Sequence, residues 1–201
     1  MEGTVIIADD DLSIRTVLSQ AFIRAGCRVK ATGTISTLWR WIEEGEGDIL
    51  ITDVILPDGD TLDILPTLKK KRPELPIIVI SALTTVVTAI RATEAGSYEY
   101  LAKPFDLKDM LSLVNRVLSG TINKEHPYDA SDKLGLEKDK LAGKLPLIGG
   151  SSSMQEVYRI MARLINTDLG VMIVGASGTG KELVAKALHN FGPRNLKPFL
   201  A

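Results

Sequence analysis

Five short runs of mostly apolar or β-branched residues recur along the first half of the chain, and helical patterns separate them. The runs are residues 5–8, 28–31, 49–52, 77–80 and 98–102. Between the first two, apolar residues recur at helical spacing from Ile14 to Ala25. This alternation predicts a parallel sheet covered by helices on both faces. Five such units within residues 1–119 predict one doubly wound α/β domain, because a closed barrel needs eight strands and about 250 residues.

Polar side chains stand where four of these runs end. They are Asp9 and Asp10 after the first run, Asp53 after the third, Ser81 after the fourth and Lys103 after the fifth. Because parallel strands present their carboxyl ends at one edge of a sheet, we expect these side chains to converge. Converging carboxylates repel one another unless a cation offsets them, and oxygen ligands suit Mg²⁺. We therefore predict Mg²⁺ bound by Asp9, Asp10 and Asp53.

The same set of side chains suits the transfer of a phosphoryl group. A carboxylate beside Mg²⁺ can attack a phosphodonor and become an acyl phosphate, and we assign that role to Asp53. Lys103 and Ser81 are predicted to contact the transferred group through a positive charge and a hydroxyl. Any single acid after a strand could instead be a helix cap, which is the role predicted for Asp11.

The residues at these positions resemble the receiver domain of two-component response regulators. The resemblance rests on Asp9-Asp10, Asp53 with Pro57, Ser81-Ala82, Tyr100 and Lys103-Pro104-Phe105. It implies a flavodoxin-like fold, metal-binding acids Asp9 and Asp10, a phosphoacceptor Asp53, and Ser81 and Tyr100 as switch residues. It also implies a cis Lys103–Pro104 peptide bond. Thr61 departs from the glycine of many receivers, and we expect only a local loop difference there.

The proposed switch has a physical basis. A new dianionic group near Ser81 can draw its hydroxyl inward and free space that Tyr100 can fill. The alternative for Tyr100 is an aromatic residue at the rim of the site with no gating role.

A glycine-rich loop marks the last third of the chain. Residues 171–174 are predicted to form a strand, and helices are predicted at residues 154–164 and 183–188. The loop between the strand and the second of these helices fits G-x-x-x-x-G-K, whose backbone N–H groups and lysine bind phosphates. We therefore predict ATP binding by Gly175, Ser177, Gly178, Thr179, Gly180, Lys181 and Glu182.

This segment resembles the start of the AAA+ domain of bacterial activators of sigma-54 RNA polymerase. The resemblance rests on Leu147-Ile148-Gly149-Gly150 and on residues 175–185, where Glu182 is normal for the family and Ala176 is a departure. With residues 37–42 and 89–96, the chain is similar to NtrC-type response regulators. We predict a receiver domain at residues 1–119, a linker at 120–145, and an incomplete N-terminal part of the AAA+ domain at 146–201. Within the linker, a solvated helix over residues 132–141 is the alternative.

The resemblance implies a response regulator phosphorylated on Asp53 by a sensor histidine kinase, controlling sigma-54-dependent transcription and nitrogen assimilation. The receiver would catalyse its own phosphorylation, and a receiver homodimer is an expected partner. We expect the chain to be truncated, because no arginine finger, sigma-54 contact loop or DNA-binding helix-turn-helix is evident. Contacts with sigma-54 RNA polymerase and DNA would then need a longer chain, and ATPase activity is not expected.

Two other functions remain open from sequence. The first is a stand-alone receiver that acts as a phosphate sink or interaction module with a vestigial P-loop. The second is a haloacid-dehalogenase-like phosphatase, which Asp58-Gly59-Asp60-Thr61 superficially resembles. The second is weakly supported, because the nucleophile of such enzymes directly follows a strand, whereas Asp58 follows Pro57 in a loop beyond the end of the predicted strand.

The charge and the cysteine content limit the binding partners and the cellular compartment that we expect for this protein. Twenty-four basic and 25 acidic side chains give a net charge of −1, which argues against binding nucleic acid or membranes by bulk electrostatics. The single Cys27 cannot form an intramolecular disulfide, and no apolar run is long enough to span a membrane. We therefore expect a cytoplasmic protein without a membrane partner.

Overall fold

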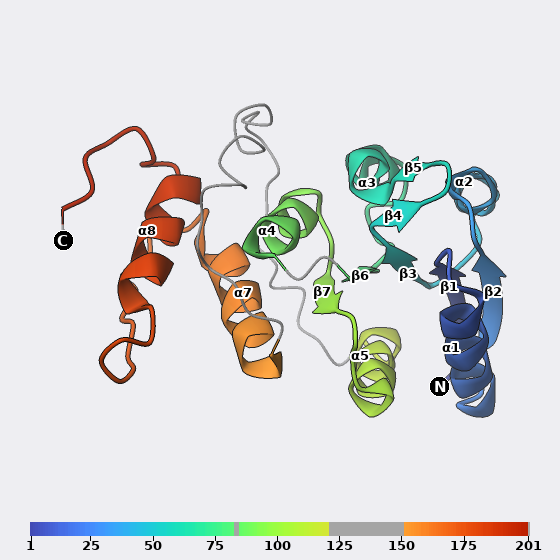
Figure 1. Ribbon diagram of the computed structural model, residues 1–201. Coiled ribbons are helices and arrows are strands. Elements are labelled where there is room, and N and C mark those ends of the chain that lie inside the picture. The colour runs from blue at the N-terminus through green and yellow to red at the C-terminus, as the bar shows by residue number, and fades with distance from the viewer. Residues whose placement is uncertain (83–84, 121–150, 201) are drawn as a thin grey trace. The chain divides into compact units, whose positions relative to one another are not determined.

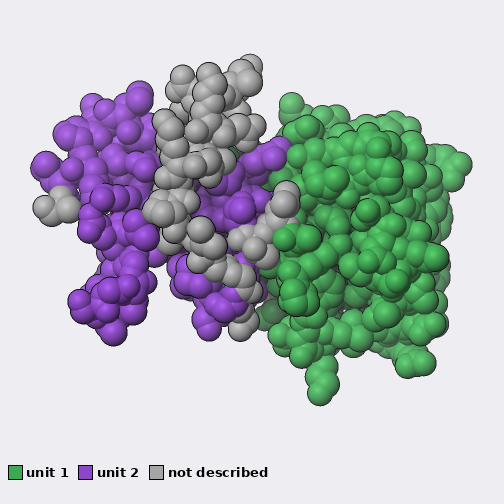
Figure 2. All heavy atoms as spheres, in the orientation of Figure 1, with its two compact units in different colours: residues 1–83, 92–129 green, residues 84–91, 130–201 purple. Residues whose placement is uncertain are grey.

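The computed structural model describes residues 1–82, 85–120 and 151–200. These residues fall into two compact units (Figure 2), one made of residues 1–82 and 92–120 and the other of residues 85–91 and 151–200. The predicted linker, with its alternative helix at 132–141, lies outside the described residues, so the proposed domain boundaries there stay a prediction.

The first unit is built on a five-stranded parallel sheet with the strand order β2-β1-β3-β6-β7. The strands are β1 (Thr4–Ala8), β2 (Arg28–Thr32), β3 (Ile49–Asp53), β6 (Ile77–Ser81) and β7 (Glu99–Ala102). All five predicted strands are therefore present, with ends shifted by one residue at most. The chain runs outward from β1 to β2 and then returns to β3 on the other side, so the connections diverge at the carboxyl ends of β1 and β3.

Helices follow the strands as the periodicity predicted (Figure 1). In the first unit they are α1 (Leu12–Arg24), α2 (Ile35–Glu43), α3 (Thr61–Lys71) and α5 (Leu107–Leu118). Helix α4 (Val86–Glu94) follows β6 in the chain, but its residues 86–91 belong to the second unit. Figure 1 shows α1 and α5 on one face of the sheet and α2 and α3 on the other. The doubly wound α/β fold is thereby confirmed for this unit.

A core cluster fills the space between the sheet and the face that α1 and α5 cover. It combines alternate strand residues with apolar residues of the two helices, among them Ile7, Ile51, Phe22, Met110 and Val114. Burial of this continuous apolar surface is the main force that holds the helices on the sheet.

Helix caps fall where the sequence places acids. The Asp11 carboxylate accepts hydrogen bonds from Ser13 N–H at 2.7 Å and Ile14 N–H at 3.4 Å, and Asp106 accepts from Lys108 N–H at 2.7 Å. Each bond satisfies an amide of the first helical turn that has no partner within its helix. The predicted capping role of Asp11 is confirmed.

A short hairpin that the sequence did not predict follows β3. Strands β4 (Ile55–Leu56) and β5 (Gly59–Asp60) pair antiparallel and lead directly into α3. Two-residue strands are too short to show a period in the sequence. The hairpin holds the loop after Asp53 in a defined conformation.

The second unit contains α7 (Ser152–Leu164) and α8 (Lys181–Phe191), which contact each other. The predicted strand at residues 171–174 is wrong, because this segment has no regular secondary structure and exposes Met172 and Val174. A strand needs a neighbour to complete its hydrogen bonds, and no described residue pairs with this segment.

Within the described part of the chain, no helix is both long and apolar enough to cross a bilayer.

Candidate functional site

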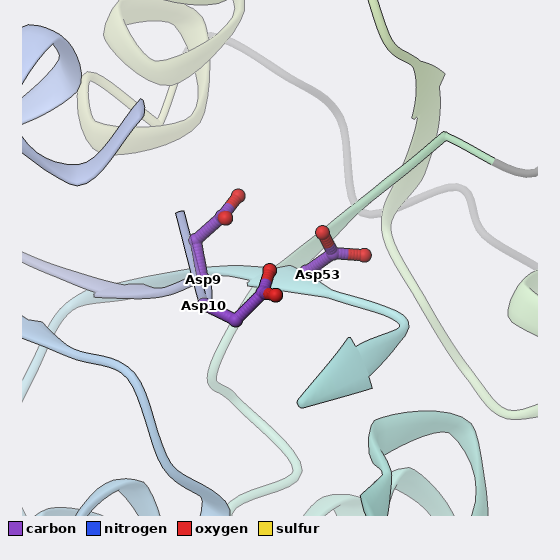
Figure 3. A group of neighbouring side chains, drawn as sticks. All are labelled: Asp9, Asp10 and Asp53. Atoms are coloured by element: carbon purple, nitrogen blue, oxygen red, sulfur yellow. The ribbon is translucent and has the colours of Figure 1, made fainter. Parts of the chain in front are cut away.

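Three carboxylates meet where the strand connections diverge (Figure 3). Asp9 and Asp10 follow β1 and Asp53 ends β3, and one carboxylate oxygen from each lies within 4.8 Å of the other two. Asp9 is fully buried and Asp53 is 8% exposed, whereas Asp10 faces solvent. The sequence-based expectation that these acids converge agrees with this arrangement.

Lys103 joins two of the acids. Its ammonium donates a hydrogen bond to Asp9 Oδ2 at 2.7 Å and another to Asp53 Oδ2. Lys103 follows β7 and is joined to Pro104 by a cis peptide bond, as the resemblance implied. One ammonium against three carboxylates leaves the cluster with net negative charge, which favours a bound cation.

Burial and charge shift the acid–base behaviour of the site. Burial raises the pKa of the Asp9 carboxyl, although hydrogen bonds from Lys103 and from Asp11 N–H act to lower it. Burial alone would lower the pKa of the Lys103 ammonium, but its hydrogen bonds to Asp53 and Asp9 outweigh burial and raise it. Lys103 therefore stays charged, and a cation beside Asp9 would favour its ionised form.

These side chains fit a hard divalent cation. Three carboxylates supply only oxygen ligands, which Mg²⁺ prefers, and the exposed Asp10 leaves one side open to water. Asp9, Asp10 and Asp53 are the residues that could hold the ion.

Ser81 lies on β6, the strand next to β3, and Tyr100 lies on β7, which pairs with β6. Ser81 ends β6 and is 1% exposed, and Tyr100 in β7 is 3% exposed. Burial raises the pKa of the Tyr100 hydroxyl, and the negative charge of Asp53 adds to the shift. Tyr100 is therefore an interior residue whose hydroxyl is affected by the charge of Asp53, and it is not an aromatic residue at the rim of the site.

Three residues that shape the site have roles that sequence reasoning did not identify. Arg15 donates a hydrogen bond to the carbonyl of Asp9, Thr61 donates one to the carbonyl of Asp53, and Asp58 binds amides of α2. Thr61 carried a signal as a departure from the receiver pattern, and Asp58 was noted only for the superficial resemblance to phosphatases. Because both oxygens of Asp58 accept hydrogen bonds from backbone amides of α2, the structure does not favour the phosphatase interpretation.

The glycine-rich loop of the second unit leads directly into α8. Gly178 and Gly180 adopt φ values of 80° and 84°, a left-handed conformation that suits glycine. The Lys181 ammonium and the Thr179 hydroxyl both donate to the carbonyl of Ala176, at 2.6 and 2.8 Å. Glu182 forms an ion pair with Lys186 at 2.7 Å. The predicted phosphate-binding residues therefore lie in one exposed loop at a helix N-terminus.

Comparison with known proteins agrees with both parts of the chain. Residues 5–115 match the response regulator receiver domain, and residues 147–201 match the sigma-54 interaction domain. The chain is 54% identical over 200 residues to the DNA-binding transcriptional regulator NtrC of Azospirillum brasilense, covering 99% of this chain and 40% of that protein. It thus spans about 40% of the length of the curated relatives it matches.

Solved structures give the same result. The crystal structure of NtrX from Brucella abortus in complex with ADP matches with a TM-score of 0.56 and 26% identity, covering 100% of this chain and 42% of that one. The beryllofluoride-activated NtrC4 receiver domain dimer matches with a TM-score of 0.56 and 28% identity, covering 59% of this chain and 98% of that one. With the acidic site and the two family matches, these likenesses show that the chain belongs to the response regulator receiver family, as an NtrC-like two-component regulator that joins a receiver domain to part of a sigma-54 interaction domain.

Proposed function

We propose that Asp53 accepts a phosphoryl group from a sensor histidine kinase in a reaction that requires Mg²⁺. The observation that carries the proposal is the Lys103 ammonium, which bridges Asp9 and Asp53 inside a cluster of three carboxylates. A merely structural acid would need no such arrangement of charges at the end of a central strand.

Each residue of the cluster has a part in the transfer. A carboxylate oxygen of Asp53 forms a bond to phosphorus while the bond from phosphorus to the donor imidazole nitrogen breaks. Asp9, Asp10 and Asp53 would hold Mg²⁺, which would supply positive charge for the transferring group. Lys103 adds a second positive charge beside Asp53, and the Ser81 hydroxyl is a further hydrogen-bond donor.

We further propose Ser81 and Tyr100 as the residues that respond to phosphorylation. The burial of both side chains on β6 and β7, and the influence of the Asp53 charge on Tyr100, support this role. A dianionic group on Asp53 would change the charge that both side chains experience.

For the second unit we propose ATP binding at residues 175–182. The left-handed glycines, the start of α8 at Lys181 and the match to the sigma-54 interaction domain support it. This match over residues 147–201 also favours an activator over a stand-alone phosphate sink, which expects no nucleotide binding.

The remaining proposals concern a protein of the relatives' full length. Phosphorylation would control sigma-54-dependent transcription of nitrogen-assimilation genes in the cytoplasm, through contacts with sigma-54 RNA polymerase and DNA. The names of the NtrC relatives support this role, and the NtrC4 receiver dimer supports a homodimer of the receiver.

Intact-mass spectrometry tests the phosphoacceptor. The chain is incubated with Mg²⁺ and acetyl phosphate, and we expect the mass of one added phosphoryl group. Asp53→Asn should abolish the addition, whereas Asp109→Asn, which removes an exposed carboxylate from α5, should retain it. An acid-stable or undiminished addition in Asp53→Asn would refute the assignment.

A further inference from the structure

Helix α2 is capped by a residue from a distant loop. Thr34 occupies the N-cap position, but its side chain makes no capping hydrogen bond. The Asp58 carboxylate does so instead, accepting from Ile35 N–H at 2.7 Å through Oδ1 and from Ser36 N–H at 2.9 Å through Oδ2. These hydrogen bonds lower the pKa of the Asp58 carboxyl, so it carries the negative charge that a helix N-terminus favours.

Asp58 stands in the turn of the hairpin that follows Asp53. The pairs Ile55–Asp60 and Leu56–Gly59 stiffen this hairpin, and Ile55 N–H donates to Asp53 Oδ1 at 3.4 Å. The same short segment therefore touches the phosphoacceptor carboxylate at one end and α2 at the other.

Helix α2 also carries both tryptophans of the chain. The Lys71 ammonium lies 5.6 Å from the centroid of a Trp39 ring, and the Lys30 ammonium lies 5.5 Å from that of a Trp41 ring. A nearby cation changes the emission of an indole, so a small shift of α2 against α3 and β2 has an optical signal.

We infer that Asp58 is a positioning residue that connects the loop after Asp53 to α2, so that a change at the Asp53 carboxylate alters the surroundings of Trp39 and Trp41. The inference rests on the proposed phosphorylation of Asp53. When one oxygen of Asp53 becomes an acyl phosphate, the carboxylate loses its charge and shifts, which displaces the Ile55 N–H that donates to Oδ1. The paired hairpin carries that displacement to Asp58 and thus to the first turn of α2.

Tryptophan emission of the whole 201-residue chain tests the connection. Emission is recorded with Mg²⁺ before and after acetyl phosphate, and the same samples are analysed by intact mass. We expect a change in the unmodified chain and loss of most of it in Asp58→Ala. Asp58→Asn should lose only part of the change, because its amide oxygen accepts one N–H but its NH₂ cannot accept the second, and Asp58→Glu keeps both oxygens and should also retain part of the change.

Controls separate failure of the inference from failure of the proposed function. Asp109→Asn should keep the full emission change, and Trp39→Phe and Trp41→Phe assign the signal. No mass increase in the unmodified chain would contradict phosphorylation itself. A normal mass increase with an undiminished emission change in Asp58→Ala would overturn the inference, as would equal loss in Asp58→Glu and Asp58→Ala when circular dichroism shows both folded.

Discussion

Replacing Thr61 by valine tests how the hydroxyl of this residue fixes the phosphoacceptor loop. The side chain is 1% exposed, and Oγ1 donates to the carbonyl of Asp53 and to that of Val54 at 3.2 Å. Valine keeps the shape but removes the donor. Both carbonyls retain another partner, because Thr52 Oγ1 also donates to Asp53 O and Thr61 N–H also donates to Val54 O.

The donors that both carbonyls retain determine how much the substitution lowers the free energy of unfolding. A carbonyl left without any partner would cost about 1–3 kcal/mol, whereas loss of one hydrogen bond among several costs about 0.5–1.5 kcal/mol. We therefore expect Thr61→Val to lower the free energy of unfolding by about 1 kcal/mol. With a urea m-value of about 1–3 kcal/mol per M, the midpoint should fall by roughly 0.3–1 M.

Tryptophan fluorescence is a suitable assay, because both tryptophans lie in α2 and report on the first unit alone. Thr61→Ser is the matched variant: it keeps the hydroxyl and should phosphorylate at the normal rate, while Thr61→Val should be slower. A Thr61→Val midpoint equal to or above that of the unmodified chain would refute the reasoning.

Three further expectations concern other parts of the molecule. The folded-state pKa of Asp9 is raised above 3.8, so the contribution of Asp9 to stability is largest below that pH and is lost as pH rises through the folded pKa. Without Mg²⁺, the variant Asp9→Asn should therefore resist urea better than the unmodified chain at pH 7. This gain in stability should shrink towards pH 4. Gly47→Ala should lower the free energy of unfolding in urea by roughly 2–4 kcal/mol, because at φ 83° its Cβ would lie 2.5 Å from buried Ile6. Gly45→Ala, at φ 78° with open space around it, should lower it by about 1 kcal/mol. Equal losses in the two variants would contradict the clash. Lys181→Ala should abolish binding of a fluorescent ATP analogue, and undiminished binding would remove Lys181 from the proposed site.

The fold of the first unit could be predicted because its signals are local. Each strand is a short run of mostly apolar or β-branched residues and helical patterns separate the runs, so the element order alone implies a doubly wound sheet. The convergence of Asp9, Asp53 and Lys103 then follows from topology, since parallel strands end at one edge.

The features that could not be predicted depend on contacts between residues that lie far apart in the sequence. Asp58 caps a helix that begins 23 residues earlier, and no spacing in the sequence marks such a pair. The apolar run at residues 171–174 has the composition of a strand, but a strand forms only where a neighbour completes its hydrogen bonds. The hydroxyl of Thr61 shows a third case, in which a departure from the family pattern was visible but its hydrogen bonds were not.

The bridge from Lys103 to the two acids also has a consequence for the order of events during synthesis. Lys103 lies 94 residues after Asp9 and 50 after Asp53. At about 5–20 residues per second, translation reaches Lys103 roughly 3–10 s after Asp53. Throughout that interval the nascent chain holds the carboxylates without their ammonium, so β1 and β3 can meet only against charge repulsion or around a captured cation. Magnesium concentration should therefore affect how early the emerging chain becomes resistant to protease.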